Sequence, residues 1–349
     1  MTNSIPGLLA FMGSGETTPN GGLVFEAAAK TLPPSPRIGI LETPAGFELN
    51  STMVAKRIAD YINIRLQNYS PQIDVIAARK KDTPYATNSP ENVRSVMACD
   101  MVFLGPGSPT YAVRQLKDSL VWDAVRYRFR QGAALVLASA ACIAMGKYAL
   151  PVYEIFKAGE DPHWKPGLDL LGEFGLPCVI IPHWNNAEGG KELDTSRCFI
   201  GQERFIPLAA QLSQDVPIIG ICEHTGLLVS LKDQSCSVVG KESITVIQRG
   251  VEKVFKSGTQ FDLSEIGNYQ PISSPEYEID PEIFLHKAKI QDTKTEKRKP
   301  GVEVIALLKK RDLAREKKEW IEADMIRKQI SQLGWQIVDT PEGSRLEPI

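Results

Sequence analysis

The sequence predicts an α/β protein with a doubly wound, mostly parallel sheet, followed by a small C-terminal helical hairpin module. Short apolar runs alternate with longer stretches of helical spacing, which is typical of parallel strands joined by helices. Several of these runs end in glycine turns, such as Gly13-Ser14-Gly15 and Gly105-Pro106-Gly107. Ligands of such sheets bind beyond the carboxyl ends of the strands, so these turns mark the candidate site.

Seven apolar runs are predicted to be buried strands: Gly7–Met12, Arg37–Leu41, Asp74–Ala77, Asp100–Leu104, Ala133–Ala138, Cys178–Pro182 and Pro217–Cys222. The helical patterns between them include Ser51–Asn68 and Pro109–Gln131. After Glu223 the chain has short, closely spaced β-rich stretches, which we expect to form an antiparallel ribbon of the same domain. These stretches are Leu227–Leu231, Cys236–Val239, Ser243–Ile247 and Val251–Phe255.

Composition divides the chain into three parts. Residues 1–270 form the α/β domain, residues 271–301 form a linker, and residues 302–349 form the helical module. The linker is rich first in proline and serine and then in charged residues, a composition that is typical of a connecting segment.

The C-terminal module has its own pattern and its own charge. Helical spacing runs over Val302–Leu333, Gly334 is suited to cap the last helix, and a short strand is expected at Trp335–Val338. Between Lys287 and Gln329 the chain has 14 Lys and Arg against 8 Asp and Glu, a net charge of +6, whereas the rest of the chain has −8. This asymmetry indicates a separate module with a different partner.

The overall composition excludes several classes of protein. Hydrophobic residues make up 43% and charged residues 23%, and the net charge is −2, so the whole chain carries no strong field for nucleic acid or a membrane. The six cysteines form no CxxC pair and no metal-ligand spacing with the four histidines, which predicts reduced thiols and no metal. No basic leader or membrane-length apolar stretch is present, so we expect a cytoplasmic protein with no membrane contact.

Ser139 is the candidate nucleophile. It follows the apolar strand Ala133–Ala138 and precedes small residues that begin a helix. Such a turn lifts a hydroxyl clear of the sheet and directs the amide of the next residue, Ala140, at the oxyanion that develops in acyl transfer. The alternative is an ordinary turn in which Ser139 caps the helix, since the GxSxG form of the motif is absent.

Gly107 and His183 are the candidate partners of this nucleophile. Gly107 follows a buried strand and can donate its N–H as the second oxyanion donor, although such a turn can also simply open a helix at a proline. His183 follows the apolar residues of the run Cys178–Pro182, where a general base is expected. If it is the base, Ser139 Oγ and a ring nitrogen of His183 lie about 2.6–4 Å apart.

Two glutamates, Glu154 and Glu223, are candidates for orienting His183 and stabilising its cation. Glu223 ends an apolar strand, where an unpaired carboxylate is costly. That strand is expected to end beside the strand that carries His183, which favours Glu223. His224, next along the chain, stays open as an alternative base.

These stretches together resemble the S51 peptidase family, which includes the α-aspartyl dipeptidases and the cyanophycinases. The matching motifs run in the family's order over about residues 7–260: Gly13-Ser14-Gly15-Glu16, Gly105-Pro106-Gly107-Ser108, Leu137-Ala138-Ser139-Ala140-Ala141, Pro182-His183-Trp184, Ala187-Glu188-Gly189-Gly190, Thr195-Ser196-Arg197 and Gly220-Ile221-Cys222-Glu223. The resemblance implies a class I glutamine amidotransferase-like fold and a serine-type hydrolase of a small peptide or amide, with an aspartyl-type substrate and no cofactor.

The resemblance also implies further site residues and a set of departures. Ser108, Asn185 and Arg197 are expected to contact the substrate, and a homodimer is a further expectation. Leu137 and Ala141 replace the family's two glycines in the nucleophile turn, and Pro106 replaces a glycine in the oxyanion turn. These changes leave a second hypothesis open, namely a catalytically degenerate binding module on the same fold.

The tail resembles the extreme C-terminal helical module of the cysteinyl-tRNA synthetases. The resemblance is carried by R-x-x-A-R and W-x-x-A-D-x-I-R patterns and by the ending Asp339-Thr340-Pro341-Glu342-Gly343. No synthetase catalytic signature occurs in the chain. The hypothesis is that the tail contacts RNA or tRNA through basic side chains, namely Lys309, Lys310, Arg311, Arg315, Lys317 and Lys318. Interleaved acids could neutralise them, which would leave a packing or oligomerisation hairpin.

Overall fold

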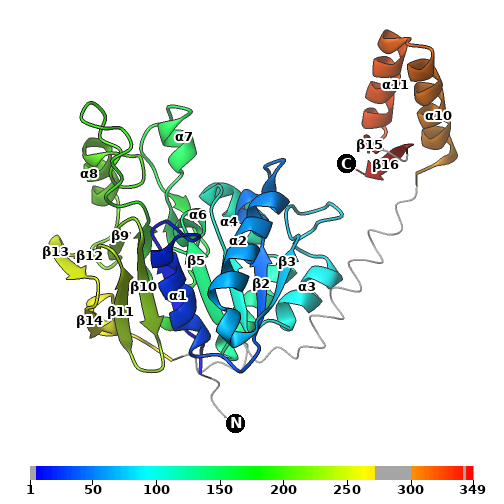
Figure 1. Ribbon diagram of the computed structural model, residues 1–349. Helices are drawn as coiled ribbons and strands as arrows, with labels where there is room; N and C mark the ends of the chain where they lie inside the picture. The colour runs from blue at the N-terminus through cyan, green and yellow to red at the C-terminus, as the bar shows by residue number, and fades with distance from the viewer. Residues whose placement is uncertain (1–4, 272–299, 341–342, 349) are drawn as a thin grey trace. The chain divides into compact units, whose positions relative to one another are not determined.

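A computed structural model describes residues 5–271, 300–340 and 343–348 of the chain (Figure 1). The chain divides into two compact units. The main unit comprises Met1–Lys81 and Tyr85–Leu285, and the small unit comprises Asp82–Pro84 and His286–Ile349. Residues 272–299 of the predicted linker lie outside the described residues.

The main unit is built on an eight-stranded sheet, which confirms the predicted fold class. Its strands, in spatial order, are β14 (Gln260–Asp262), β11 (Ser235–Gly240), β10 (Thr225–Ser230), β1 (Leu9–Met12), β5 (Ala134–Ala138), β4 (Met101–Leu104), β2 (Arg37–Leu41) and β3 (Gln72–Ile76). The five strands from β1 to β3 pair in parallel, and the other three add antiparallel partners at the β1 side.

A second, four-stranded sheet lies in the same unit, in the order β13 (Val251–Lys256), β12 (Ser243–Gln248), β9 (Ile218–Ile221) and β8 (Val179–Ile181). The prediction of one ribbon after Glu223 was wrong, because β10 and β11 join the large sheet while β12 and β13 join β9. The chain changes sheets at Gly240, where φ is +106° and a Cβ would lie 2.4 Å from the carbonyl oxygen of His224. Only glycine permits this bend.

Helices cover the large sheet. Figure 1 shows α1 (Pro19–Ala29) and α2 (Ser51–Arg65) in front of it, and their apolar faces share a core with alternate side chains of the parallel strands. The remaining elements of the main unit are η1 (Thr43–Ala45), η2 (Gln67–Tyr69), α3 (Pro90–Met97), α4 (Pro109–Leu116), α5 (Leu120–Arg130), α6 (Ala140–Ala144), β6 (Tyr148–Ala149), α7 (Val152–Phe156), β7 (Lys165–Pro166), η3 (Leu171–Phe174), α8 (Gln202–Ala210) and η4 (Leu263–Glu265).

The predicted helix over Pro109–Gln131 is two helices, α4 and α5. Asp118 between them has a φ of +57°, which no helix interior allows. Ser119 then caps α5 by accepting a hydrogen bond from the amide of Trp122 at 3.2 Å. The sequence contained this signal, since an Asp-Ser pair is a common helix start.

The small unit contains two helices and a hairpin: α10 (Val302–Glu316), α11 (Trp320–Gln332), β15 (Trp335–Thr340) and β16 (Gly343–Pro348). Its core consists of Val304, Ile326, Ile330, Trp335 and Ile337. The two helices and the first strand were predicted, whereas β16 was not. Within the part of the chain that the structure describes, neither unit has a helix with the length and apolarity that crossing a bilayer requires.

Candidate active site

Ser139 sits on a strained turn between β5 and α6. Its φ of 51° and ψ of −116° lie outside the regions that residues with a Cβ usually adopt. The side chain makes no capping hydrogen bond to α6, so the alternative that Ser139 is an ordinary helix cap is wrong. A strained strand-to-helix turn of this kind raises the hydroxyl above the sheet edge.

The hydroxyl of Ser139 is held by His183. Ser139 Oγ lies 2.9 Å from His183 Nε2, within the range expected from the sequence. His183 follows β8 of the second sheet, and its amide donates to the carbonyl of Gly13, which follows β1 of the first sheet, at 3.3 Å. Since Met12 is paired with Ala138, this contact anchors the histidine beside the nucleophile turn.

Glu223 holds the other side of the imidazole. Its Oε1 lies 3.0 Å from His183 Nδ1. This contact follows from the sheet, because β8 and β9 are parallel neighbours with Ile181 opposite Gly220, and each of the two side chains comes just after its strand. The expectation that these two strands end side by side is confirmed.

Two asparagines hold Glu223 in place. The side chain of Asn186 donates to Glu223 Oε1 at 2.9 Å, and the side chain of Asn185 accepts from the Glu223 amide at 2.8 Å. Burial raises the pKa of the Glu223 carboxyl, but the hydrogen bonds from His183 and Asn186 outweigh it and leave the pKa below its ordinary value. Sequence reasoning missed Asn186, although a polar residue three positions after a candidate base was a usable signal.

Glu154 lies elsewhere. It is on α7, and its Oε1 pairs with the Nζ of Lys165 at 3.4 Å. Its Oε2 is buried. Among the described residues no hydrogen bond joins Glu154 to His183, so Glu223 is the acid that the structure brings to the histidine.

The two candidate oxyanion donors come from neighbouring strand ends. Leu104 of β4 is paired with Leu137 of β5, so the turn containing Gly107 emerges beside Ser139 and Ala140. Neither the Gly107 amide nor the Ala140 amide donates a hydrogen bond to a described residue.

The three predicted substrate contacts have other partners in the structure. Ser108 caps α4 by accepting from the amide of Tyr111 at 3.2 Å, and Asn185 binds the backbone of Glu223. The guanidinium of Arg197 stacks over the ring of Trp184 at 3.8 Å and donates to the Trp184 carbonyl at 3.1 Å.

The departures from the family motif leave the nucleophile turn intact. Leu137 and Ala141 are both fully buried, and Ser139 between them still adopts the strained conformation. Leu137 belongs to β5 and contributes to the interior of the sheet rather than to the surface of the turn.

Comparison with solved structures identifies the fold of the main unit. The crystal structure of a peptidase from an acI-B1 Actinobacterium superposes with a TM-score of 0.60 at 17% sequence identity, covering 74% of this chain and 98% of the peptidase. The main unit has the fold of that peptidase. No family model matches the chain.

The C-terminal part is similar to a different class of protein. Over 43 residues the chain is 51% identical to a cysteine–tRNA ligase of Lactobacillus helveticus and 54% identical to cysteine–tRNA ligase 1 of Burkholderia lata. A ligase of Caldicellulosiruptor saccharolyticus is 43% identical over 47 residues. Each match covers 12–14% of this chain and only 9–10% of the ligase.

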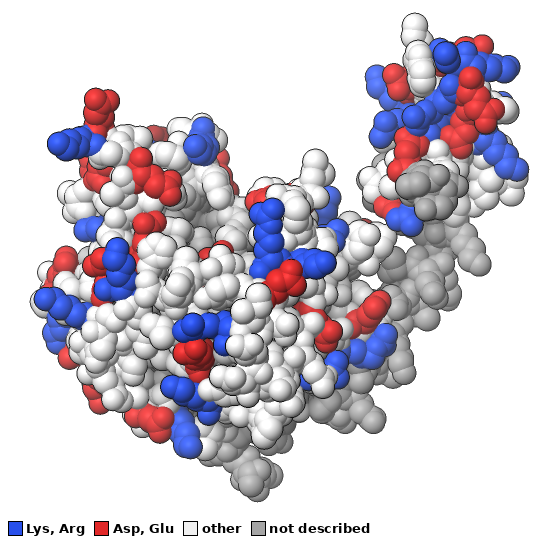
Figure 2. Space-filling view, viewed as in Figure 1, with Lys and Arg blue, Asp and Glu red and all other residues white. Residues whose placement is uncertain are grey.

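The basic residues of the small unit do not form one free face. Arg311 is only 3% exposed and forms ion pairs with Asp312 and Asp339, and Arg315 also pairs with Asp339. Figure 2 shows acidic and basic side chains interleaved over this unit. Two of the six predicted phosphate contacts are thus engaged within the fold, while the four lysines are exposed: Lys309, Lys310, Lys317 and Lys318.

The cysteines follow the expectation of reduced, mostly buried thiols. All six cysteines are buried and unpaired, which confirms the prediction of free, buried thiols. Among the described residues, no group of three or more His, Cys, Asp or Glu side chains is placed to hold a metal ion.

Proposed function

We propose that the main unit is a serine-type hydrolase that cleaves a small peptide or amide. The observation that carries the proposal is the contact series from Ser139 Oγ to His183 Nε2 and from His183 Nδ1 to Glu223, with the serine on a strained turn. A serine needs an adjacent base for nucleophilic attack, and that base needs a fixed orientation. The peptidase fold supports the same reaction class by analogy alone.

In this proposal each residue has one step. Ser139 Oγ attacks the substrate carbonyl carbon while His183 Nε2 accepts the hydroxyl proton. The carbonyl oxygen becomes an oxyanion that accepts hydrogen bonds from the Gly107 and Ala140 amides. The C–N bond breaks as His183 returns the proton to the leaving amine, and a water activated by His183 then hydrolyses the acyl-serine. Glu223 accepts from Nδ1–H and stabilises the imidazolium.

The aspartyl-type substrate rests on the sequence resemblance. A substrate panel tests the proposed reaction directly: dipeptides with acidic, basic and apolar first residues, and simple amides, are incubated with the wild type and with Ser139→Ala. We expect release of the free amine from at least one class with the wild type and at least 10³-fold slower release with Ser139→Ala, on the order of what losing a triad residue costs. Equal rates for the two proteins would contradict the proposal.

The alternative, a binding module without catalysis, is distinguished by the same panel. Such a module binds members of the panel in calorimetry, and it turns over none of them. The strained conformation of Ser139 favours the enzyme, because strain of this kind is retained where the chemistry uses it.

A second proposed activity concerns the small unit, which we infer contacts RNA. Its support is the similarity to cysteine–tRNA ligases and the four exposed lysines Lys309, Lys310, Lys317 and Lys318. A filter-binding titration of the full-length protein against bulk tRNA at low salt tests it. We expect replacement of these lysines by alanine to weaken binding at least tenfold and to flatten its salt dependence.

The matched control removes the same charge from the main unit, at Lys30, Lys56, Lys241 and Lys256, which are also exposed. If both quadruple variants bind alike, the attraction is a net-charge effect and the small unit is a packing or oligomerisation hairpin.

A further inference from the structure

Glu42 is a buried carboxylate outside the Ser139–His183–Glu223 series. It directly follows β2 and is only 3% exposed, where a charge without partners would be costly. Its oxygens accept hydrogen bonds from the hydroxyls of Ser51 at 2.7 Å and Thr52 at 3.3 Å, and from Arg79 Nε at 2.7 Å and Nη2 at 3.3 Å. Glu42 and Arg79 together are called the clamp below.

The clamp is connected to the turn that carries the Gly107 amide. This oxyanion turn comprises Gly105–Ser108. The carbonyl of Arg79 accepts a hydrogen bond from the hydroxyl of Tyr111 at 2.8 Å, and the amide of Tyr111 donates to Ser108 Oγ. One arginine thus pairs with Glu42 through its side chain and with the first turn of α4 through its backbone.

The clamp reaches Gly107 by a second route through η1. The backbone carbonyl of Glu42 accepts from the Ala45 amide at 3.0 Å, which shapes the segment around Pro44. The Pro44 carbonyl accepts from the Ser108 amide at 2.8 Å. Gly107 has a φ of +143°, and a Cβ there would lie 1.9 Å from the Pro44 oxygen, so its backbone lies directly against this segment.

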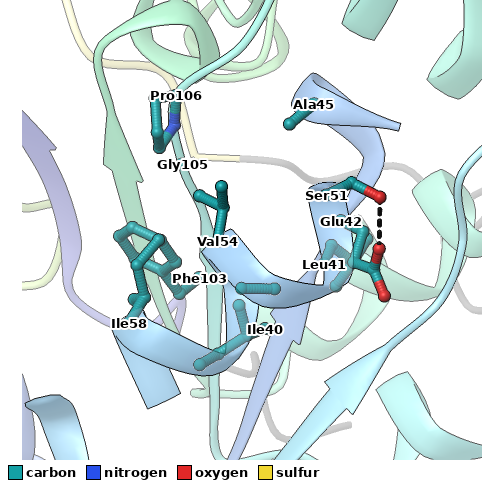
Figure 3. Close-up of a pocket in the computed structure, with 11 residues that line it drawn as sticks. Ile40, Leu41, Glu42, Ala45, Ser51, Val54, Ile58, Phe103, Gly105 and Pro106 are labelled. Carbon is teal, nitrogen blue, oxygen red and sulfur yellow. Dashed lines mark hydrogen bonds between the residues drawn. The ribbon is translucent and has the colours of Figure 1, made fainter. Parts of the chain in front are cut away.

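A small cavity lies next to the oxyanion turn. A cavity of about 20 Å³ lies under Gly105 and Pro106, bounded mainly by apolar side chains of β2, α2 and Phe103 (Figure 3). This is roughly the space of one water molecule. Figure 3 shows the Glu42–Ser51 hydrogen bond at the opposite side of this cavity. Gly105 packs against Phe103 beside this cavity, whereas Ser108 is held by hydrogen bonds to the Pro44 carbonyl and from the Tyr111 amide.

We propose that Glu42 and Arg79 are positioning residues for the Gly107 amide in the hydrolase proposed above, on which this inference rests. Pro106 has no N–H, so this turn offers fewer donors than a glycine-rich one, and the direction of the Gly107 N–H becomes decisive. Oxyanion donors act only when they are held at hydrogen-bond distance from the developing charge. The clamp fixes the Pro44 segment and the start of α4, and these fix Gly107.

Two readouts test the proposal separately from the reaction itself. The first is hydrogen exchange of the Ser108 amide, which is bonded to Pro44 and requires no activity. The second is the reaction of Ser139 with a fluorophosphonate, resolved into the inactivation rate constant and the apparent affinity. The variants are Glu42→Gln, Arg79→Met and the conservative Arg79→Lys. The matched control is Glu173→Gln, which also removes a carboxylate that pairs with arginines, Arg126 and Arg130, in a different part of the main unit.

We expect Glu42→Gln and Arg79→Met to speed hydrogen exchange of the Ser108 amide about tenfold or more. The same variants should lower the inactivation rate constant of Ser139 about 10- to 100-fold, while the apparent affinity for the fluorophosphonate stays within about threefold of the wild type. Arg79→Lys keeps the positive charge but loses the two-pronged hydrogen bonding of the guanidinium. We therefore expect it to recover part of the inactivation rate constant that Arg79→Met loses. Unchanged exchange of the Ser108 amide in Glu42→Gln and Arg79→Met would contradict the claim that the clamp holds the oxyanion turn, regardless of the fluorophosphonate kinetics. Faster exchange with an unchanged rate constant, or an equal loss of rate in Glu173→Gln, would overturn its role in positioning the donor.

Discussion

At the scale of single residues, the candidate site is a series of side-chain contacts from Ser139 through His183 to Glu223. Ser139, His183 and Glu223 could each be singled out because an apolar run ends just before them, and their contacts now lie at 2.9 and 3.0 Å. Asn186 stands three positions after the candidate base, which was a usable signal, whereas Glu42 could not be assigned because its arginine partner lies 37 positions away along the chain. Arg197 was predicted to bind substrate only because of its place in the order of motifs. In the structure it stacks on Trp184, a contact that depends on backbone geometry and that a motif does not encode.

Asn186 gives a prediction about pH. Its hydrogen bond is one of the contacts that lower the pKa of Glu223, so Asn186→Ala raises that pKa. The carboxylate, which is the form that stabilises the His183 cation, is then lost at a higher pH than in the wild type. The ratio of variant to wild-type rate should therefore fall as pH is lowered, by about tenfold for each unit of pKa change once both carboxyls titrate. Rate–pH profiles of Ser139 labelling in the two proteins measure this ratio. A ratio that stays constant with pH would contradict the role of Asn186 in lowering the pKa of Glu223.

At the scale of elements, hydrophobic periodicity predicted where the strands and helices lie, but it did not predict which strands pair with one another. All seven predicted parallel-type strands are present, yet two of them form a separate sheet with β12 and β13. Periodicity reports which residues are buried, not which neighbour buries them. The break between α4 and α5 was missed because the apolar spacing continues across Asp118 and Ser119, where local capping decides the outcome.

Leu137 tests whether the altered nucleophile turn is obstructed. Because it is fully buried in β5, Leu137→Ala should lower the free energy of unfolding by about 2–5 kcal/mol. Leu135→Ala, two residues earlier in the same strand and 1% exposed, is the matched control and should cost a similar amount. Urea denaturation measures both. Labelling of Ser139 in the folded variants should stay within about threefold of the wild type, whereas a tenfold gain specific to Leu137→Ala would mean that the leucine blocks the turn.

At the scale of the whole molecule, the site lies where two sheets meet. The large sheet supplies Ser139 after β5, and the small sheet supplies His183 and Glu223 after β8 and β9, with the amide of His183 bonded to Gly13 across the junction. The sequence predicted strand ends that converge, because carboxyl ends of parallel strands share an edge. It could not predict that two sheets contribute them. The C-terminal helices pack on a core of their own.

The small unit should respond to acid by itself. Hydrogen bonds from Arg311 outweigh burial and, with those from Ser344 and Arg315, hold the pKa of Asp339 far below its ordinary value. A carboxyl with a depressed folded-state pKa contributes stability above its unfolded pKa, about 3.9, and loses that contribution as pH falls toward the folded value. Hydrogen exchange of the full-length protein should thus show peptides from residues 302–338 losing protection below about pH 4, and Asp339→Asn should reduce their protection already at pH 7. Equal protection of Asp339→Asn and the wild type at pH 7 would contradict this account of the ion pair.

The central claim is that Ser139 is an activated nucleophile, and covalent labelling tests it most directly. The wild type, Ser139→Ala, His183→Ala and Glu223→Gln are treated with a fluorophosphonate, and the modified residue is identified by peptide mass spectrometry. The account predicts a single adduct on Ser139 in the wild type, none in Ser139→Ala, and labelling slowed by about 10³-fold or more in the His183 and Glu223 variants. An unlabelled wild type, or a Ser139 adduct that forms equally fast without His183, would contradict it.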